Sequence, residues 1–379
     1  MRAVALIDGE HVTEVVRDAL AELPYDWVGA ILVGGSEKLR GDTSYGVPLL
    51  PDFADAELVV DLSDEPVLGP GERFRWASRA LAAGLPYIGA DFRFEPQRFE
   101  EVGVPSVGVV GAGKRVGKTA VTAHLASLAA RDRDVTVVAM GRGGPREPEL
   151  VERPPAVEDL VALSRTGRHA ASDHLELAAI TGLPTIGCRR AGGGLAGRPF
   201  VSNILDGARL AAQRRPDLVV FDSSGSAVPP VAVDRRVLVV SAAHDLDSYF
   251  GTYRRLISDL VVAIGCEPAG AIPARIELRA LAPLDGRVAV FTAGPVATDT
   301  LAADVVHVSQ NLGHRVALAA ELERIDADTY LTELKGAAID LVAEHALARG
   351  SRVVLAANDV VADGLDDALL ELLPEAVPA

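Results

Sequence analysis

The chain has 379 residues and a formal net charge of −16, with 49% hydrophobic and only 4% aromatic residues, so it is long enough for two or three α/β domains with aliphatic cores. The acidic balance excludes an extended nucleic-acid or anionic-membrane surface, and two cysteines are too few for a disulfide framework. No uncharged run approaches the ~20 residues of a membrane helix and the first residues do not form a signal peptide, so we expect a cytoplasmic protein with no nucleic-acid partner and no membrane partner.

Strands and helices alternate through the first hundred residues. Strands are predicted at 3–8, 27–35, 56–63 and 86–91, and helices at 12–23 and 72–84. This alternation predicts a parallel sheet covered by helices. We therefore predict a small Rossmann-like α/β domain over residues 1–103, which binds substrate, closes as a lid or makes a homodimer. Its candidate substrate ligands are Asp8, Glu10 and His11 at the end of the first strand and Lys38 in "GGSEKLRG".

A second alternating pattern begins at residue 104. Strands are predicted around 107–111, 135–141, 184–188, 217–224, 236–243, 259–265, 287–294, 304–309 and 352–358, and helices at 118–131, across 156–182, before residue 215 and at 329–350. The pattern predicts a P-loop NTPase-type parallel sheet flanked by helices, in one catalytic domain over 104–379. Residues 285–379 are either further strands of that sheet or a C-terminal lobe.

The stretch "GAGKRVGKT" joins the first strand of this domain to a helix. It differs from G-x-x-x-x-G-K-[ST] because Ala112 takes the place of the first glycine, with Gly111 and Gly113 beside it. Loop N–H groups and the helix N-terminus are expected to hold the β-phosphate of ATP, with Lys118 on the β and γ oxygens and Thr119 on Mg²⁺. The predicted ATP ligands are Gly111, Gly113, Lys114, Arg115, Val116, Gly117, Lys118, Thr119 and Ala120.

The strand "DLVVFDSSG" ends on Asp222. In this type of fold a carboxylate at that point organises Mg²⁺ directly or through water. The alternative is a strand-end carboxylate that caps a turn. We predict that Asp222 and Thr119 hold the metal and that Lys114, Lys118 and Asp222 are catalytic.

Two glycine-rich loops carry arginines at the predicted carboxyl edge of the sheet, where ligands of open α/β sheets bind. "MGRGGPREPEL" contains Arg142 and Arg146, and "CRRAGGGLAGRPFVSN" contains Arg189, Arg190, Ser202 and Asn203. Glycine lets a phosphate approach the backbone, and arginine binds two of its oxygens. Only four of the 37 basic residues are lysines, and the fourth of these, Lys335 in "ELKGAAID", joins the candidate substrate ligands.

Several blocks of the sequence resemble the cyclic 2,3-diphosphoglycerate synthetase family. They include "ALIDGEH", "VGVVGAGKRVGKTAV", "MGRGGPREPELV", "TIGCRRAGGGLAGRPFVSN" and "ELKGAAID", and they occur in order from residue 3 to about residue 345. The resemblance implies an ATP-dependent ligase that closes 2,3-diphosphoglycerate into its cyclic phosphoanhydride and releases ADP and phosphate, with Mg²⁺ and stimulation by K⁺. One departure is "FDSSGS", where the family suggests Glu-Gly, so the direct metal contact of the shorter Asp222 is in question.

Two other functions share the loop. A related P-loop kinase or ligase would act on another phosphorylated small acid. A ParA-like ATP switch would require a DNA or membrane partner, for which this acidic chain has no basic patch or amphipathic anchor.

Overall fold

The computed structural model describes residues 1–38, 44–242 and 246–375, apart from the side chain of Lys38. It forms two compact units. The front unit comprises Met1–Arg98 and Asp245–Ile257, and the main unit comprises Phe99–His244 and Ser258–Ala379. Helix α7 (Gly251–Leu256) thus groups with the front unit, although its neighbours in sequence belong to the main unit.

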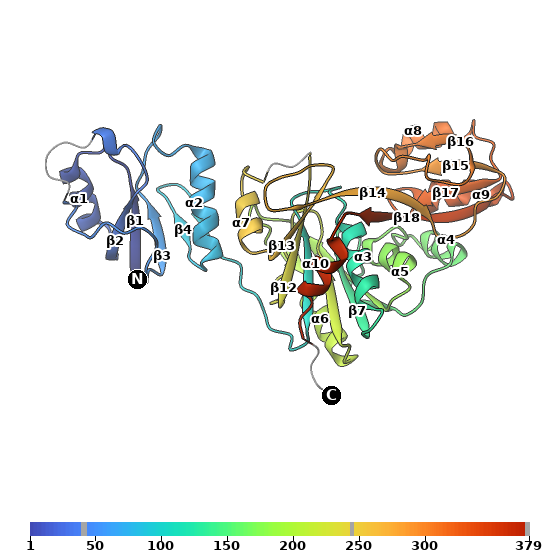
Figure 1. The fold of residues 1–379 in the computed structure, drawn as a ribbon, viewed down its shortest axis with the longest axis horizontal. Helices are drawn as coiled ribbons and strands as arrows, with labels where there is room; N and C mark the ends of the chain where they lie inside the picture. Colours follow the sequence, from blue (N-terminus) through green and yellow to red (C-terminus); the bar gives the residue numbers. More distant parts are fainter. Residues whose placement is uncertain (39–43, 243–245, 376–379) are drawn as a thin grey trace. The chain divides into compact units, whose positions relative to one another are not determined.

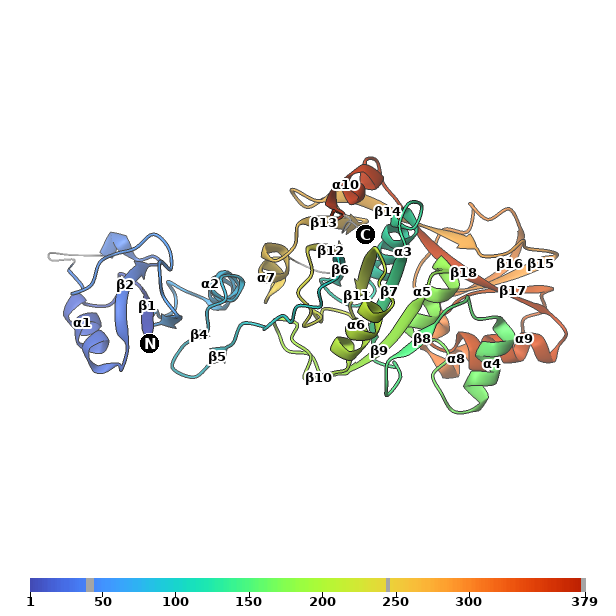
Figure 2. The same ribbon diagram turned by 90° about the horizontal axis from the view of Figure 1, so that it is seen from below.

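The front unit is built on a five-stranded sheet of order β2-β1-β3-β4-β5; Figure 1 labels the first four of these strands and Figure 2 labels β5. Its strands are β1 (Arg2–Ile7), β2 (Asp26–Leu32), β3 (Leu58–Asp61), β4 (Tyr87–Ile88) and β5 (Arg93–Phe94). All neighbours are parallel except β4 and β5. Helix α1 (Thr13–Glu22) packs its apolar face on the sheet. Helix α2 (Pro70–Ala82) carries Phe74, whose ring is tilted against that of Phe94 and makes a T-shaped contact with that of Phe250.

The main unit has a 13-stranded sheet among the described residues, with the order β10-β9-β7-β11-β6-β12-β13-β14-β18-β17-β15-β16 and β8 beside β9. Its first half contains β6 (Ser106–Gly111), β7 (Val135–Gly141), β8 (Glu149–Val151), β9 (Thr185–Ala191), β10 (Val201–Ser202), β11 (Leu218–Asp222), β12 (Arg235–Ser241) and β13 (Leu260–Ile264). Strands β8 and β10 pair antiparallel with β9, whereas the strands that follow one another in the sheet from β9 through β7, β11, β6 and β12 to β13 are parallel. Their carboxyl ends therefore share one edge, and β6, which leads into the P-loop, lies between β11 and β12.

Helices cover both faces of this half of the sheet (Figure 2). Helices α3 (Lys118–Ala129), α5 (Asp173–Thr181) and α10 (Leu365–Leu372) pack with one core cluster, and α6 (Ile204–Gln213) packs with the cluster on the opposite face. Helix α4 (Val157–Arg165) lies beside α5 in a third cluster that includes Leu334 and Ile339. Buried apolar residues of β7 and β11 belong to both principal clusters, as expected for strands covered on both faces, and those of β6 belong to the first.

The second half of the sheet continues through β14 (Ile272–Ala280), β15 (Arg287–Phe291), β16 (Asp304–Ser309), β17 (Thr329–Glu333) and β18 (Arg352–Val361). Among these five described strands, only β14 and β18 pair antiparallel with each other. Short helices accompany these strands: η2 (Asn311–Gly313), α8 (Arg315–Leu322), the π-helix η3 (Ala338–Ala343) and α9 (Glu344–Ala348).

The predicted helix at 329–350 is wrong in its first part, because Thr329–Glu333 forms the buried strand β17. Three of its five residues are β-branched or aromatic and the segment is buried on both faces, which favours a strand. Gly336, with φ +55°, turns the chain before the helical part begins. Strands β5, β8, β10 and β14 and helices α8 and α10 were not predicted.

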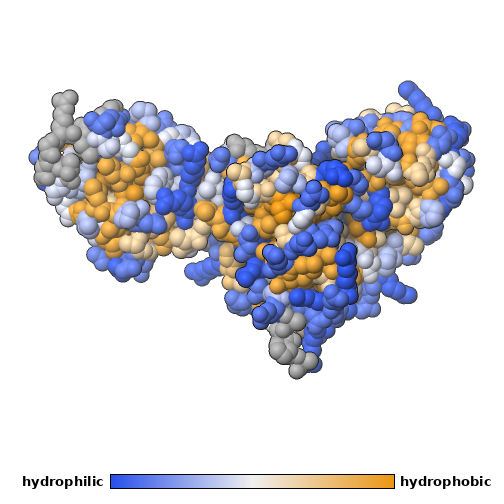
Figure 3. All heavy atoms as spheres, viewed as in Figure 1, coloured by the Kyte–Doolittle hydropathy of each residue, from blue (hydrophilic) through white to orange (hydrophobic). Residues whose placement is uncertain are grey.

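The α/β fold with a P-loop sheet preceded by a smaller α/β unit is confirmed. On the face drawn in Figure 3, apolar side chains lie in separate patches interrupted by polar ones. Among the described residues, no helix is both long and apolar enough to cross a membrane.

Candidate phosphate-binding site

The loop between β6 and α3 has the backbone of a phosphate-binding turn. Strand β6 is buried throughout and ends at Gly111, and α3 begins at Lys118. Arg115 and Gly117 have left-handed φ values of +64° and +88°, so the loop turns sharply before the helix and leaves its N-terminus free for an anion. A Cβ at Gly111 would lie 2.9 Å from the Gly225 carbonyl oxygen, so this position requires glycine.

Lys118 and Asp222 form a buried ion pair beneath this loop. Lys118 Nζ lies 2.5 Å from Asp222 Oδ1, and the Thr122 hydroxyl donates to the same oxygen at 2.6 Å. Among the described residues, Asp222 Oδ2 and the neighbouring Ser223 hydroxyl are buried without a hydrogen-bond partner. Buried polar groups of this kind are rare unless something binds them, so both point to a ligand at the end of β11.

Two arginines from different loops meet beside the P-loop. A Cβ at Gly225 would lie 3.4 Å from Arg142 Nη2 and 3.6 Å from Arg190 Nη2. Arg190 is held by the carbonyl oxygens of Ser224 and Gly192 at 2.9 and 2.8 Å. Burial, followed by the charge of Arg142, lowers the pKa of Arg190. Two guanidinium groups this close repel each other unless an anion lies between them, so the arrangement favours anion binding.

Asn203 braces the two arginine loops rather than facing solvent. Its Oδ1 accepts the Arg189 N–H at 2.7 Å, and its Nδ2 donates to the carbonyl oxygens of Pro145 and Arg146 at 3.3 and 3.1 Å. The Ser202 hydroxyl donates to the Arg189 carbonyl oxygen at 2.9 Å. The side chains of Arg189 and Arg146 are exposed at this edge, so Ser202 and Asn203 hold the loops that present them.

Lys335 is also brought to this side of the sheet, but it has protein partners. Its Nζ lies 3.2 Å from Glu176 Oε1 and 3.6 Å from Glu333 Oε1. Burial raises the pKa of Glu176 to about 7, although Lys335 opposes this shift. Lys114 and Arg115 are exposed at the top of the loop, whereas Thr119 is half-buried and Val116 and Ala120 are in the core.

Sequence reasoning missed the acidic residues around these lysines. Asp173 begins α5, and a Cβ at Gly141 would lie 3.1 Å from its Oδ2. Burial raises the pKa of Asp173, opposed by the charge of Lys118. Asp173 and Glu176 are three residues apart and so share one face of α5. That i, i+3 pair of acids in "SDHLEL" was the available signal.

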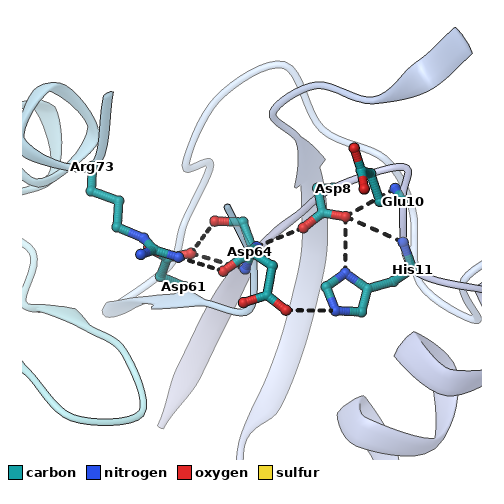
Figure 4. Close-up of polar contacts among 7 residues, drawn as sticks. Asp8, Glu10, His11, Asp61, Asp64 and Arg73 are labelled. Atoms are coloured by element: carbon teal, nitrogen blue, oxygen red, sulfur yellow. Dashed lines mark hydrogen bonds and ion pairs between the residues drawn. The ribbon is translucent and has the colours of Figure 1, made fainter. Parts of the chain in front are cut away.

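The front unit has a separate polar cluster at the carboxyl ends of β1 and β3 (Figure 4). Asp8 Oδ1 accepts from Glu10 N–H at 2.9 Å and from His11 Nδ1 at 2.9 Å, and Oδ2 accepts from Asp64 N–H at 2.7 Å. Burial alone would raise the pKa of Asp8, but these hydrogen bonds lower it. Asp61 is likewise engaged by Arg73 Nε at 3.1 Å. Asp8 therefore organises the loop that carries Glu10 and His11, and the Lys38 side chain lies outside the described residues.

The parallel sheet, the glycine-bounded loop, the helix that begins at Lys118 and the strand-end Asp222 define a P-loop nucleotide-binding protein. Family models for cyclic 2,3-diphosphoglycerate synthetase match three consecutive parts of the chain: the N-terminal domain at residues 2–95, the P-loop domain at 106–279 and the C-terminal domain at 295–359. The chain belongs to the cyclic 2,3-diphosphoglycerate synthetase family, which confirms the resemblance seen in the sequence.

Relatives with this name match almost end to end. The protein of Rubrobacter xylanophilus is 46% identical over 98% of this chain and 97% of its own length, and that of Thermococcus gammatolerans is 39% identical over 97% and 96%. The protein of Methanothermus fervidus is 35% identical over 99% and 97%. A solved structure of LpxK from Aquifex aeolicus in complex with ATP covers 73% of this chain and 91% of its own, at 12% identity and a TM-score of 0.44, which is too distant to support an argument about function.

Proposed function

We propose that this chain uses ATP to close 2,3-diphosphoglycerate into cyclic 2,3-diphosphoglycerate, releasing ADP and inorganic phosphate. The proposal rests on the family and on one feature of the site: Arg142 and Arg190 converge on Gly225, directly beside the P-loop. A P-loop alone accounts for the triphosphate. The additional arginine pair supplies a second anion site within reach of the transferred phosphoryl group.

The P-loop is proposed to bind ATP through the N–H groups of residues 111–120. Lys118 is ion-paired with Asp222, so a bound triphosphate would share this lysine with the carboxylate or compete with it. Lys114, which is exposed at the top of the loop, would then face the γ-phosphate. Cations fixed around the transferring group stabilise charge that develops in the transition state.

The residues at the end of β11 fit Mg²⁺. Asp222 Oδ2 is buried and unpartnered among the described residues, and oxygen ligands are those that Mg²⁺ prefers. Asp222 and the Thr119 hydroxyl would hold the ion, which supplies neutralisation of the phosphate charge when bound. We assign no residue to the stimulating K⁺ that the resemblance implies.

The substrate is proposed to lie at the carboxyl edge of β7 and β9. Arg142 and Arg190 would each bind phosphate oxygens, with the exposed Arg146 and Arg189 nearby. Ser202 and Asn203 would act by holding the two loops together.

The chemistry is proposed to proceed in two stages. One substrate phosphate attacks the γ-phosphorus of ATP, forming a pyrophosphate group and releasing ADP. The other substrate phosphate then attacks the inner phosphorus of that group, which closes the ring and expels inorganic phosphate. Intramolecular attack of this kind reaches effective molarities of about 10⁵–10⁸ M, and it requires that water be excluded while the activated phosphate is present.

The front unit is proposed to bind the diphosphoglycerate or to exclude water during ring closure, and a homodimer is the proposed assembly. Deleting the residues before Val104 tests this role. Full ring-closing activity of the shortened chain would contradict it, whereas uncoupled ATP hydrolysis would support it.

The stimulation of ATP hydrolysis by a panel of phosphoglycerates tests the substrate. We expect 2,3-diphosphoglycerate to stimulate far more than the 2- or 3-monophosphates. Strongest stimulation by a monophosphate would instead indicate a kinase of the same fold. Positional isotope exchange in ATP that depends on the diphosphoglycerate would support the pyrophosphate stage.

A further inference from the structure

The buried charge cluster around Lys335 has no role in the reaction proposed above. Glu176 on α5 and Glu333 at the end of β17 are each only 4% exposed, and both lie within ion-pair distance of Lys335 Nζ. Glu333 is itself fixed by the Ala293 N–H at 2.6 Å and by the Asn358 amide. An ammonium group shared by two buried carboxylates has little net charge left to attract a phosphate. The geometry thus favours a role for Lys335 within the protein over the role of substrate ligand.

The turn that carries Lys335 is connected to the P-loop by close backbone packing. Gly336 lies against the Leu312 carbonyl oxygen, which a Cβ at this position would approach to 2.2 Å, and the same oxygen accepts the Ala337 N–H at 3.0 Å. The next residue, Gly313, lies beside the end of the Arg115 side chain, because a Cβ there would lie 3.0 Å from Arg115 Nη2. A continuous line of contacts therefore runs from α5 to the phosphate-binding loop.

The backbone of Arg115 has a conformation that needs support from neighbouring residues. Its φ of +64° is left-handed, which is unfavourable for a residue with a side chain and persists only where neighbouring structure holds it. The end of the Arg115 side chain lies beside Gly313, so the 312–313 turn limits where this side chain can lie. Any element that fixes the 312–313 turn thereby helps to fix the P-loop.

We propose that Lys335, held by Glu176 and Glu333, keeps the 335–337 turn and the 312–313 turn packed beside Arg115. In this way it keeps the P-loop in its phosphate-binding conformation, and we call Lys335 and its two carboxylate partners the latch. Glu176 is then a positioning residue that acts through Lys335. This inference rests on the proposed function only because its test measures KM for ATP and for diphosphoglycerate.

The first test is Glu176→Gln, with Glu344→Gln as the matched control. Glu344 pairs with Arg165 through two 2.8 Å hydrogen bonds and also joins the C-terminal strands and helices to the first half of the unit, but its side chain is 31% exposed. We expect Glu176→Gln to raise KM for ATP about tenfold, with KM for diphosphoglycerate unchanged within twofold. The control should leave both values unchanged. Lys335→Arg, which preserves the charge, should recover most of the ATP affinity that Lys335→Met loses.

A double-mutant cycle with Arg115→Ala tests the line of contacts. If the latch acts through Arg115, Glu176→Gln should have less than a twofold effect on KM for ATP in the Arg115→Ala background. Full additivity would overturn the proposal. A selective rise of KM for diphosphoglycerate in Lys335→Met would also overturn it, because it would make Lys335 a substrate ligand. Failure of the wild-type chain to form cyclic product would contradict the proposed function instead, and ADP affinity would still report on the latch.

Discussion

Replacing Arg142 by glutamine removes one of the two guanidinium groups that meet at Gly225. A hydrogen bond to a charged group contributes about 1.5–3 kcal/mol. Arg142 is exposed, so we take the lower value, which corresponds to about a tenfold loss in kcat/KM for diphosphoglycerate. Arg190 is half-buried and also holds Ser224, so Arg190→Gln should lose more, about a hundredfold.

Steady-state rates at saturating ATP, with diphosphoglycerate varied, measure this loss. Arg209→Gln is the matched control, because Arg209 is an exposed arginine on α6 whose partners are Asp206 and Glu100. Arg142→Gln should leave KM for ATP and the midpoint of thermal unfolding unchanged. Equal activity of Arg142→Gln and the control, or an equal rise in KM for both substrates, would refute the arginine pair as the second anion site.

Three further predictions concern the same unit. Lys118→Met should abolish activity and lower the free energy of unfolding, measured without ligand, by about 3 kcal/mol, because Asp222 stays buried without its cation. Urea unfolding measures this loss, and unchanged stability would contradict the ion pair between Lys118 and Asp222. Gly225→Ala should lose about 1 kcal/mol of stability, because φ at this position is +58°. The added methyl group would lie between the two arginines, so calorimetry should show weaker binding of diphosphoglycerate and unchanged binding of ADP. Burial raises the pKa of Glu176 from its usual 4.5 to about 7, so the stability that this residue contributes is greatest below pH 4.5 and is lost as the pH rises through 7. Burial lowers the pKa of His174 from 6.5 to about 4, so the stability that His174 contributes is lost as the pH falls through that range. In unfolding measured against pH, Glu176→Gln should therefore remove the loss of stability at rising pH, and His174→Gln should remove the loss of stability at falling pH. An unchanged profile in either variant would contradict the shifted pKa of the residue that was replaced.

The phosphate-binding half of the site could be read from the sequence because its chemistry is local. A strand, a glycine-bounded loop and Lys118-Thr119 at the start of a helix are adjacent in the chain. The convergence of Arg142 and Arg190 was also foreseeable in outline, because parallel strands bring their carboxyl ends to one edge. The sequence left open which arginine of each loop points toward Gly225.

The remaining parts depend on contacts between distant segments. Nothing local in "ELKGAAID" indicates that Lys335 meets Glu176, which lies far earlier in the chain. The periodicity of 329–350 favoured a helix because burial of β17 on both faces removes the alternation that identifies a strand. The grouping of α7 with the front unit likewise follows from packing around Phe74 and Phe250, which no linear pattern reveals.

The most direct test of the central claim is ³¹P NMR of the full chain with ATP, Mg²⁺ and 2,3-diphosphoglycerate. The account predicts a new cyclic phosphoanhydride signal that grows in step with ADP and inorganic phosphate, and that does not appear with Lys118→Met. Release of ADP and phosphate without a cyclic anhydride, or at a rate that does not depend on diphosphoglycerate, would contradict it.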